Sequence, residues 1–127
     1  MSVRFAGYAA VFDVVDRGGD VLRRGAFRVP GAVPLLWQHG GDPVGAVEWI
    51  EEDDKGLRVI GRVEAPMLAR LVRDGGVTGL SFGYRVRESR RGPRGRELLQ
   101  VALVEVSLVA SPMQRLARVH AVEPVRG

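Results

Sequence analysis

The sequence contains no cysteine, so disulfide bonds and thiol catalysis are excluded for this chain. It contains only two histidines, His39 and His120, which leaves a zinc site almost without ligands. No apolar run approaches the roughly 20 residues that span a bilayer, and the first residues show no charged-then-apolar leader. We therefore expect no metal, no cofactor and no membrane partner.

Lysine is also nearly absent, because Lys55 is the only one and all other basic residues are arginine. The net charge is +4 and the isoelectric point is about 10.6. Many arginines stand beside Asp or Glu, and only the segment from Arg85 to Arg96 forms a dense basic run. This charge balance permits acidic partners, and it does not identify nucleic acid as one of them.

The 127 residues, of which 46% are hydrophobic, suffice for one core and not for two independent ones. We expect residues 1–127 to form one domain, alone or in a small oligomer. Period-two or short apolar runs predict strands over residues 3–13, 33–39, 44–52, 57–64, 78–88 and 97–110. The mostly β content favours a small barrel or sandwich over an alternating α/β fold.

Between these strands, glycine, proline and apolar spacing predict the connections. Asp53–Gly56 is typical of a hairpin, with Gly56 at a positive φ, and residues 40–43 predict a turn. A helix is expected from Pro66 to Gly75, burying Met67, Leu68, Leu71 and Val72. A helical turn near residues 21–27 and a short helix from Ser111 to His120 complete the prediction.

A serine between two glycines stands out in the segment Gly79–Tyr84, which reads Gly-Leu-Ser-Phe-Gly-Tyr. Period-two alternation puts Ser81 on the face opposite Leu80, Phe82, Tyr84 and Val86. The flanking glycines would leave room for a substrate backbone near the hydroxyl, which makes Ser81 a candidate nucleophile. The alternative is a serine on the wet face of a strand, with glycines that mark a bulge.

A serine nucleophile needs a base and a group that orients the base. His39 follows Trp37 at the predicted end of a strand, beside a loop, whereas His120 lies near the end of the sequence; the alternative for His39 is a surface histidine. Glu105 interrupts the most apolar stretch of the chain, residues 101–109, and needs a partner there.

Ser81 and Glu105 are equally far from Pro93, which lies in the Arg/Gly/Pro tip between the last two predicted strands. An antiparallel hairpin about that tip would bring both residues onto the same face within a residue or two of register. The alternatives for Glu105 are a salt bridge to an arginine such as Arg85, or a place on an exposed edge strand.

Three segments, taken together, resemble one known family. They are Leu35–His39, Gly79–Tyr84 and Val104–Val109, supported by Gly7–Phe12, Asp20, Gly25–Phe27, Gly56–Leu57 and Gly61–Val63. In this order and spacing the chain resembles the prohead (capsid maturation) proteases of HK97-like tailed phages, which are distantly similar to herpesvirus maturational proteases. The resemblance covers nearly the whole chain. One departure is Pro112-Met113-Gln114, where the family often has Pro-Ala-Asn, so no oxyanion role is transferred to that segment.

The resemblance implies a Ser/His/Glu triad of Ser81, His39 and Glu105 on a small closed β-barrel like the herpesvirus enzymes, mostly β with a few short helices (α+β). It implies a serine endopeptidase that cleaves capsid or scaffold protein during assembly of a phage, prophage or gene transfer particle. The expected setting is inside procapsids in the bacterial cytoplasm, as a homodimer whose helices meet. The short chain implies a minimal member or a form without a self-cleaved C-terminal segment.

Oxyanion donors are not assigned by the sequence; the backbone N–H groups near Phe82 and Gly83, or the Arg115 side chain, are the candidates. Two other functions stay open. One is a noncatalytic barrel that binds nucleic acid through the Arg-rich tip, although Phe82 and Tyr84 are expected to be buried rather than free to stack on bases. The other is an inactive, capsid-associated relative of such proteases.

Overall fold

The computed structural model describes residues 1–29 and 31–125 and contains one helix and nine strands in these ranges. In chain order the elements are β1 (Ser2–Val11), β2 (Asp20–Leu22), β3 (Phe27–Arg28), β4 (Pro34–Trp37), β5 (Gly40–Glu52), β6 (Gly56–Val63), α1 (Pro66–Arg73), β7 (Gly79–Arg91), β8 (Arg96–Val109) and β9 (Val119–Val125). The mostly β class expected from the sequence is confirmed.

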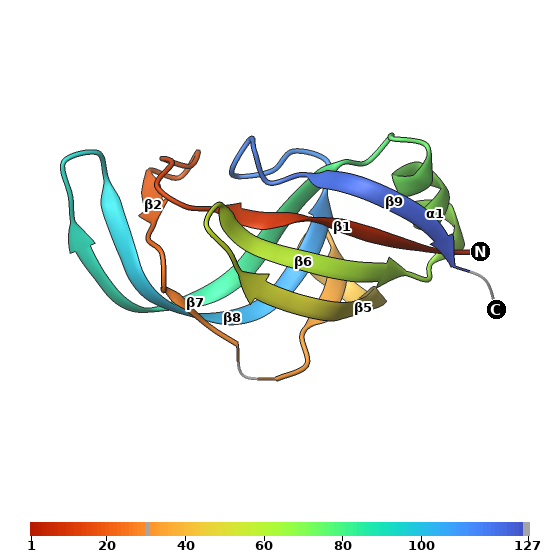
Figure 1. Cartoon of the computed structure of the whole chain (residues 1–127), viewed down its shortest axis with the longest axis horizontal. Coiled ribbons are helices and arrows are strands. Elements are labelled where there is room, and N and C mark those ends of the chain that lie inside the picture. Colours follow the sequence, from red (N-terminus) through yellow and green to blue (C-terminus); the bar gives the residue numbers. More distant parts are fainter. Residues whose placement is uncertain (30, 126–127) are drawn as a thin grey trace.

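All strands belong to one strongly curved sheet. Its order is β2-β8-β4-β5-β6-β1-β9, and β3 and β7 also pair with β8. Figure 1 shows β5, β6, β1 and β9 side by side, with β7 and β8 crossing them at an angle. An isolated bridge between Gly79 and Arg118 links β7 to the segment before β9, but no ladder in the described residues joins them. The closed barrel that the sequence analysis expected is therefore not confirmed.

The concave side of the sheet holds the core. Its largest fully buried side chains are Phe5, Leu35, Leu57, Leu80, Leu98, Leu103 and Leu108. The predicted apolar face of β7 is confirmed for Leu80, and Phe82 and Tyr84 pack against the core, whereas Val86 is 38% exposed because β7 has left the core by that point. Burying this apolar area is the main stabilising contribution to such a fold.

The hairpin of β5 and β6 forms as predicted, with Glu52 opposite Leu57. The role of Gly56 differs from the expectation, because its φ is not among the positive ones. A Cβ on Gly56 would instead collide with the carbonyl oxygen of Ala10 on the neighbouring strand β1. The glycine is needed for close approach of two backbones rather than for turn geometry.

Helix α1 begins at Pro66 as predicted and ends near Gly75, whose positive φ is typical of a helix C-terminus. Its buried side chains are Leu68, Ala69 and Val72. Met67 and Leu71, expected in the core, are 79% and 46% exposed. The expectation was wrong for these two because the helix is rotated so that the small residue Ala69 faces the core.

Two other predicted helical segments are wrong. Residues 111–118 form an irregular loop, because their backbone pairs with the sheet: Ala117 O accepts from Leu80 N and Arg118 O accepts from Tyr8 N. Residues 21–27 instead contribute to β2 and β3, which run parallel to β8. Between these two strands the chain makes a tight turn, in which Ala26 N donates to Arg23 O. Tertiary pairing outweighs local propensity in both segments.

The antiparallel hairpin of β7 and β8 forms about the predicted tip. Ser81 lies opposite Ser107 and Gly83 lies opposite Glu105, so Ser81 and Glu105 share one face two residues apart in register. This confirms the hairpin geometry expected from their symmetric spacing about Pro93. Strand β8 is also central, since β7 lies on one edge and β2, β3 and β4 lie on the other, which excludes the exposed edge strand considered for Glu105.

Candidate active site

His39 lies in a two-residue turn between β4 and β5. Trp37 pairs with Gly40 across this turn, and the two central residues, Gln38 and His39, have φ values of 53° and 62°. Positive φ at both central residues is the requirement of a type I′ hairpin turn, and non-glycine residues adopt it at some cost. The turn predicted at residues 40–43 is therefore wrong, because β5 already begins at Gly40. The register of the β4–β5 pairing shifts between Leu35 and Trp37.

Strand β8 holds this strained turn in place through three hydrogen bonds. Gln38 N donates to Leu108 O at 3.0 Å, and Ala110 N donates to the Gln38 side-chain oxygen at 2.6 Å. His39 N donates to Ser107 Oγ at 3.1 Å. Strain of this kind persists only where the surroundings fix it, and it is common at functional sites.

Glu105 reaches His39 from β8. Its Oε1 accepts a hydrogen bond from His39 Nδ1 at 2.5 Å, while the Glu105 side chain is 8% exposed and that of His39 is 44% exposed. A carboxylate can only accept, so Nδ1 carries the proton and Nε2 is left as the basic nitrogen. The arginine partner considered for Glu105 is wrong, because no ion pair within residues 1–29 and 31–125 joins Glu105 to an arginine.

Ser107 completes the environment of this carboxylate. Its hydroxyl is fully buried and donates to Glu105 Oε2 at 2.6 Å, while the Ser107 Oγ itself accepts from His39 N. Both carboxylate oxygens therefore have a donor, which a buried charge requires. The sequence analysis missed Ser107, although its place two residues after Glu105 on the same strand face was a usable signal.

Ser81 lies beside this pair on β7. It is 7% exposed and stands directly opposite Ser107 in the ladder. Its hydroxyl makes no hydrogen bond to the part of the chain that the structure describes, and catalytic hydrogen bonds are often long before substrate binds. Ser81 and His39 together line two adjoining hollows of about 470 and 90 Å³. The three candidate residues thus come from a turn and two strands that meet at one place.

The flanking glycines have a different role from the one expected. A Cβ on Gly83 would lie 2.5 Å from Glu105 Oε1, and a Cβ on Gly79 would lie 2.6 Å from Val109 O. Both glycines therefore make room for strand β8 and its side chains rather than for a substrate backbone. At Gly83 the missing side chain is what allows the Glu105 carboxylate to lie across the sheet surface.

The larger hollow is also lined by Arg17, Gln38, Ser111 and Met113. Arg17 lies in the loop between β1 and β2 and is held there by two contacts: its N donates to Met113 O at 3.0 Å and its guanidinium donates to Ser111 Oγ at 2.7 Å. It adds a positive charge to the wall of the hollow beside His39 and Ser81. No sequence signal marked it, because loop contacts between residues so far apart leave no local pattern.

The smaller hollow is walled by Asp16, Phe82, Tyr84 and Gln114, among others. Gln114 is 5% exposed and pairs with the backbone of Val11, accepting from its N at 2.6 Å and donating to its O at 2.9 Å. The amide thereby fastens the 111–118 loop to β1. Of the proposed oxyanion donors, Arg115 does not line either hollow, whereas Phe82 lines the smaller one.

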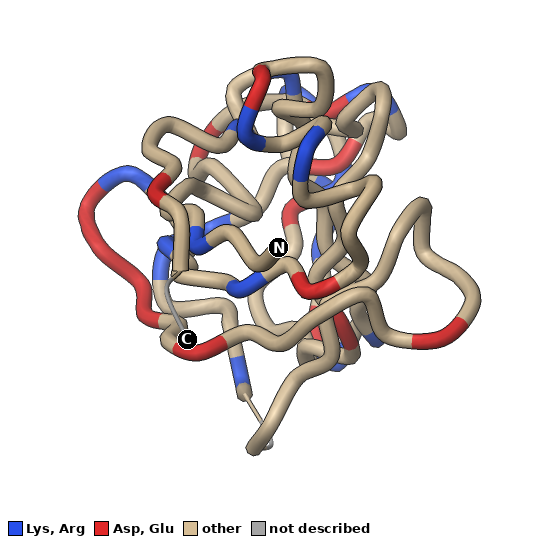
Figure 2. The backbone as a smooth tube through the Cα atoms, turned by 90° about the vertical axis from the view of Figure 1, so that its right-hand side faces the viewer, with Lys and Arg blue, Asp and Glu red and all other residues tan. Residues whose placement is uncertain are grey.

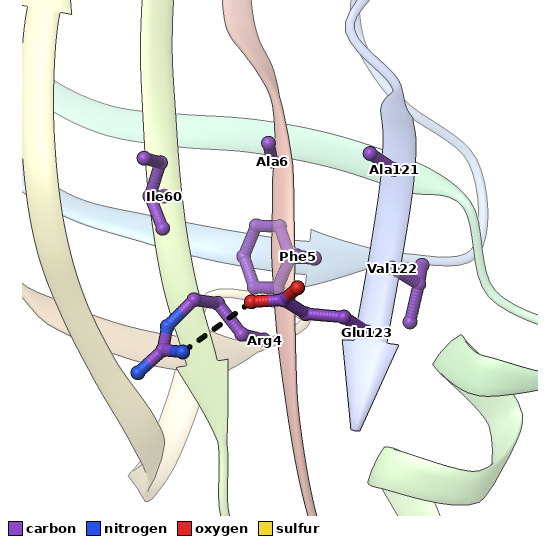
Figure 3. Close-up of a pocket in the computed structure, with 7 residues that line it drawn as sticks. All are labelled: Arg4, Phe5, Ala6, Ile60, Ala121, Val122 and Glu123. Carbon is purple, nitrogen blue, oxygen red and sulfur yellow. Dashed lines mark hydrogen bonds and ion pairs between the residues drawn. The ribbon is translucent and has the colours of Figure 1, made fainter. Parts of the chain in front are cut away.

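Other parts of the surface offer less chemistry. The hollow between β6, β1 and β9 in Figure 3 has apolar walls, and the ion pair of Arg4 and Glu123, 3.4 Å apart, crosses it. His120 packs its ring against Tyr8, with centroids 5.8 Å apart. Within the described ranges, no cluster of three His, Cys, Asp or Glu side chains could hold a metal ion, and no helix is long and apolar enough to cross a membrane.

Comparison with protein families gives a match over nearly the whole chain. The family model described as caudovirus prohead serine protease matches residues 1–125. The prohead protease of Enterobacteria phage HK97 is 33% identical over an alignment 138 residues long, which takes in 97% of this chain. The chain spans only 61% of the length of that relative.

Comparison with solved structures gives a similar fold. The crystal structure of KSHV protease in complex with a hexapeptide phosphonate inhibitor matches 98% of this chain and 66% of its own, with a TM-score of 0.64 and 13% identity. The structure of varicella-zoster virus protease matches 84% of this chain and 63% of its own, with a TM-score of 0.47 and 19% identity. The first likeness shows a herpesvirus protease-like fold.

Proposed function

The chain belongs to the caudovirus prohead serine protease family, and from this we propose that it is an endopeptidase that cleaves capsid or scaffold protein during procapsid maturation. The observation that carries the proposal is the hydrogen bond between Glu105 and His39 at the wall of a hollow that Ser81 also lines. A histidine whose Nδ1–H is held by a buried carboxylate presents Nε2 as a base, which is what an unactivated serine requires.

In the proposed mechanism, Ser81 Oγ attacks the carbonyl carbon of the scissile peptide while His39 Nε2 takes the hydroxyl proton. His39 then donates that proton to the leaving amine, which gives an acyl-enzyme on Ser81. Water then attacks the ester carbonyl while His39 Nε2 takes one of its protons. His39 returns that proton to Ser81 Oγ, which releases the carboxylic acid product and restores the free serine. Glu105 stabilises the imidazolium that forms twice in the cycle and fixes the tautomer of the ring.

Ser107 acts through Glu105 and His39 and is a positioning residue in this proposal. Its hydroxyl bonds the carboxylate and the backbone of the turn at once, so the base and its acid keep a fixed relative position. Because errors near 1 Å in such an arrangement lower the rate strongly, this clamp supports catalysis without touching substrate.

The backbone N–H of Phe82 is the proposed oxyanion donor. Leu80 N donates to Ala117 O, away from β8, and N–H groups alternate along a strand, so Phe82 N also points away from β8 while Gly83 N points toward it. In α/β-hydrolases the N–H of the residue after the nucleophile supplies one such donor. Arg17, on the wall of the larger hollow, supplies positive charge near the same place.

We further propose that residues 1–127 act as one protease domain inside assembling procapsids of a phage, prophage or gene transfer particle in the host cytoplasm. A homodimer would bury the exposed apolar side chains Met67 and Leu71 on α1. Sedimentation of Leu71→Glu, with the exposed polar-face change Arg70→Glu as control, tests this contact: a dimer through α1 becomes a monomer in the first variant only.

Coexpression with the cognate capsid precursor tests the function itself. Wild type should shorten the precursor, and Ser81→Ala and His39→Ala should leave it at full length while their melting temperatures stay close to that of wild type. Precursor that is still cleaved by a folded Ser81→Ala protein would reject the mechanism. Mass spectrometry of the shortened product would give the cleavage site.

A further inference from the structure

The basic residues of the chain are concentrated in one place. Of the 19 basic and 15 acidic residues, residues 85–97 hold six arginines and two glutamates, so this segment has the same net charge, +4, as the whole chain. The rest of the molecule is electrically balanced, and Figure 2 shows Lys and Arg interspersed with Asp and Glu over the end where the termini lie. We call residues 85–97 the arginine hairpin.

The arginine hairpin projects from the body of the protein. Figure 1 shows the far ends of β7 and β8 and their connecting turn extending beyond β2, at the end opposite the termini. Every residue from Arg85 to Arg91 is exposed, which means that both faces of β7 are open to solvent there. The burial of apolar area therefore does not account for this segment.

Four of the six arginines lack an acidic partner in the described residues. Arg90 pairs with Glu97 at 3.2 Å, and Arg96 donates to both Asp20 oxygens at 2.9 Å. The other arginines of the hairpin, Arg85, Arg87, Arg91 and Arg94, make no such pair. Arg91 also stands directly opposite Arg96 in the ladder; Asp20 partners Arg96, while Arg91 keeps a guanidinium that an added carboxylate can bind.

The surroundings of these arginines favour a protein partner over nucleic acid. The segment contains no aromatic ring on which a base could stack, and nucleotides bound as single strands depend on such rings. Between Arg85 and Arg87, Val86 is 38% exposed and offers an apolar contact. A peptide with carboxylates and small apolar side chains matches both features, and the guanidinium fork bonds carboxylates in pairs.

We propose that the arginine hairpin is a docking site for an acidic segment of the protein substrate, outside the two hollows that His39 and Ser81 line. This proposal rests on the proteolytic function. The hairpin consists of the same two strands that carry Ser81 and Glu105, and at roughly 3.3 Å per residue Arg85 and Arg91 lie about 13 and 33 Å along β7 from Ser81. Docking there raises the effective concentration of the scissile bond near Ser81.

A binding assay tests the surface without depending on proteolysis. The probe is a fluorescent (Glu-Ala)10 peptide, and the variant replaces Arg85, Arg87, Arg91 and Arg94 with Gln. The control variant replaces four exposed arginines outside the hairpin with Gln, and so removes the same four positive charges; they are Arg24, Arg28, Arg70 and Arg73. We expect affinity to fall about tenfold or more in the hairpin variant and less than about twofold in the control. Absent binding, or equal losses in the two variants, would overturn the proposal.

Two further arms separate the alternatives. If a 20-nucleotide DNA strand or duplex binds the hairpin more tightly than the peptide at 150 mM salt, the partner is nucleic acid and the proposal fails. For cleavage, the mapped site is placed in two peptides that differ only in an acidic segment joined by a ten-residue linker. Wild type should show a KM about tenfold lower for the acidic peptide at equal kcat, and the hairpin variant should show equal KM values.

These arms also distinguish failure of docking from failure of the enzyme. Cleavage of both peptides by wild type with equal KM would overturn docking and leave the protease intact. No cleavage of either peptide, or of the capsid precursor, would reject the proposed function, and the binding assay would then decide the docking surface alone.

Discussion

Gly83 stands directly opposite Glu105 in the ladder of β7 and β8, and a Cβ on Gly83 would lie 2.5 Å from Glu105 Oε1. Gly83→Ala must therefore displace the carboxylate that holds His39. We expect kcat to fall by about tenfold or more and stability by about 1–3 kcal/mol, the usual cost of overpacking. The control is Gly40→Ala, where an added Cβ meets nothing within 4 Å. Normal turnover by Gly83→Ala would show that Glu105 need not occupy its observed position.

Removing the Ser107 hydroxyl should loosen the same carboxylate from the other side. In Ser107→Ala, Glu105 Oε2 and His39 N both lose their partner, so we expect kcat to fall about tenfold to a hundredfold with KM nearly unchanged. Ser107→Thr keeps the hydroxyl and should recover most of the activity, which a purely structural role would not predict. Ser2→Ala, on β1 and in the lining of neither hollow beside His39, makes the same change elsewhere and serves as the control. Equal activities of the Ala and Thr variants would contradict the positioning role.

Glu105→Gln tests whether the carboxylate orients the base. The amide keeps the volume but can favour the wrong tautomer of His39, and the equivalent change in a Ser–His–Asp protease lowers turnover by about 10⁴. We expect a loss on the order of 10² or more here, because the longer glutamate side chain is less rigid. The melting temperature should scarcely change, since a neutral amide is easier to bury than a charge.

The matched control for that experiment is Glu48→Gln, which removes a carboxylate paired with Arg4 at 2.7 Å; Glu48 lines neither of the two hollows beside His39 and Ser81. Its turnover should equal that of wild type. A structural role for Glu105 would give the reverse pattern in Glu105→Gln, namely a lower melting temperature with normal turnover in the folded fraction.

A pH dependence of stability follows from Asp20. The Arg96 guanidinium, which donates to both oxygens, holds the pKa of the Asp20 carboxyl below its ordinary value. A lowered pKa stabilises the fold above the unfolded pKa of about 3.9, and this contribution is lost as pH falls through the folded value. Asp20→Asn should therefore melt below wild type at pH 6–7, and the difference should shrink as the pH falls below the unfolded pKa of about 3.9. Asp54→Asn, which removes the same charge at a fully exposed carboxylate, is the control. A difference that persists at low pH would contradict this origin.

Sequence analysis predicted those parts of the candidate site that follow from a simple geometric rule. The relation of Ser81 and Glu105 could be read because an antiparallel hairpin is symmetric about its tip, and Pro93 lies midway between them. The turn that carries His39 could not be read, since its positive φ values depend on anchoring to β8 rather than on glycine. The loop of residues 111–118 was mistaken for a helix because its backbone partners lie on β1 and β7, far away in sequence.

Covalent labelling tests the central proposal, that Ser81 is a nucleophile activated by His39. A fluorophosphonate reacts with a serine only where a base has made it nucleophilic, and mass spectrometry identifies the serine that carries it. The proposal predicts a single adduct on Ser81 in the wild type and none in His39→Ala, with Ser107 and Ser111 unlabelled in both. An adduct on another serine, or equal labelling of Ser81 without His39, would contradict it.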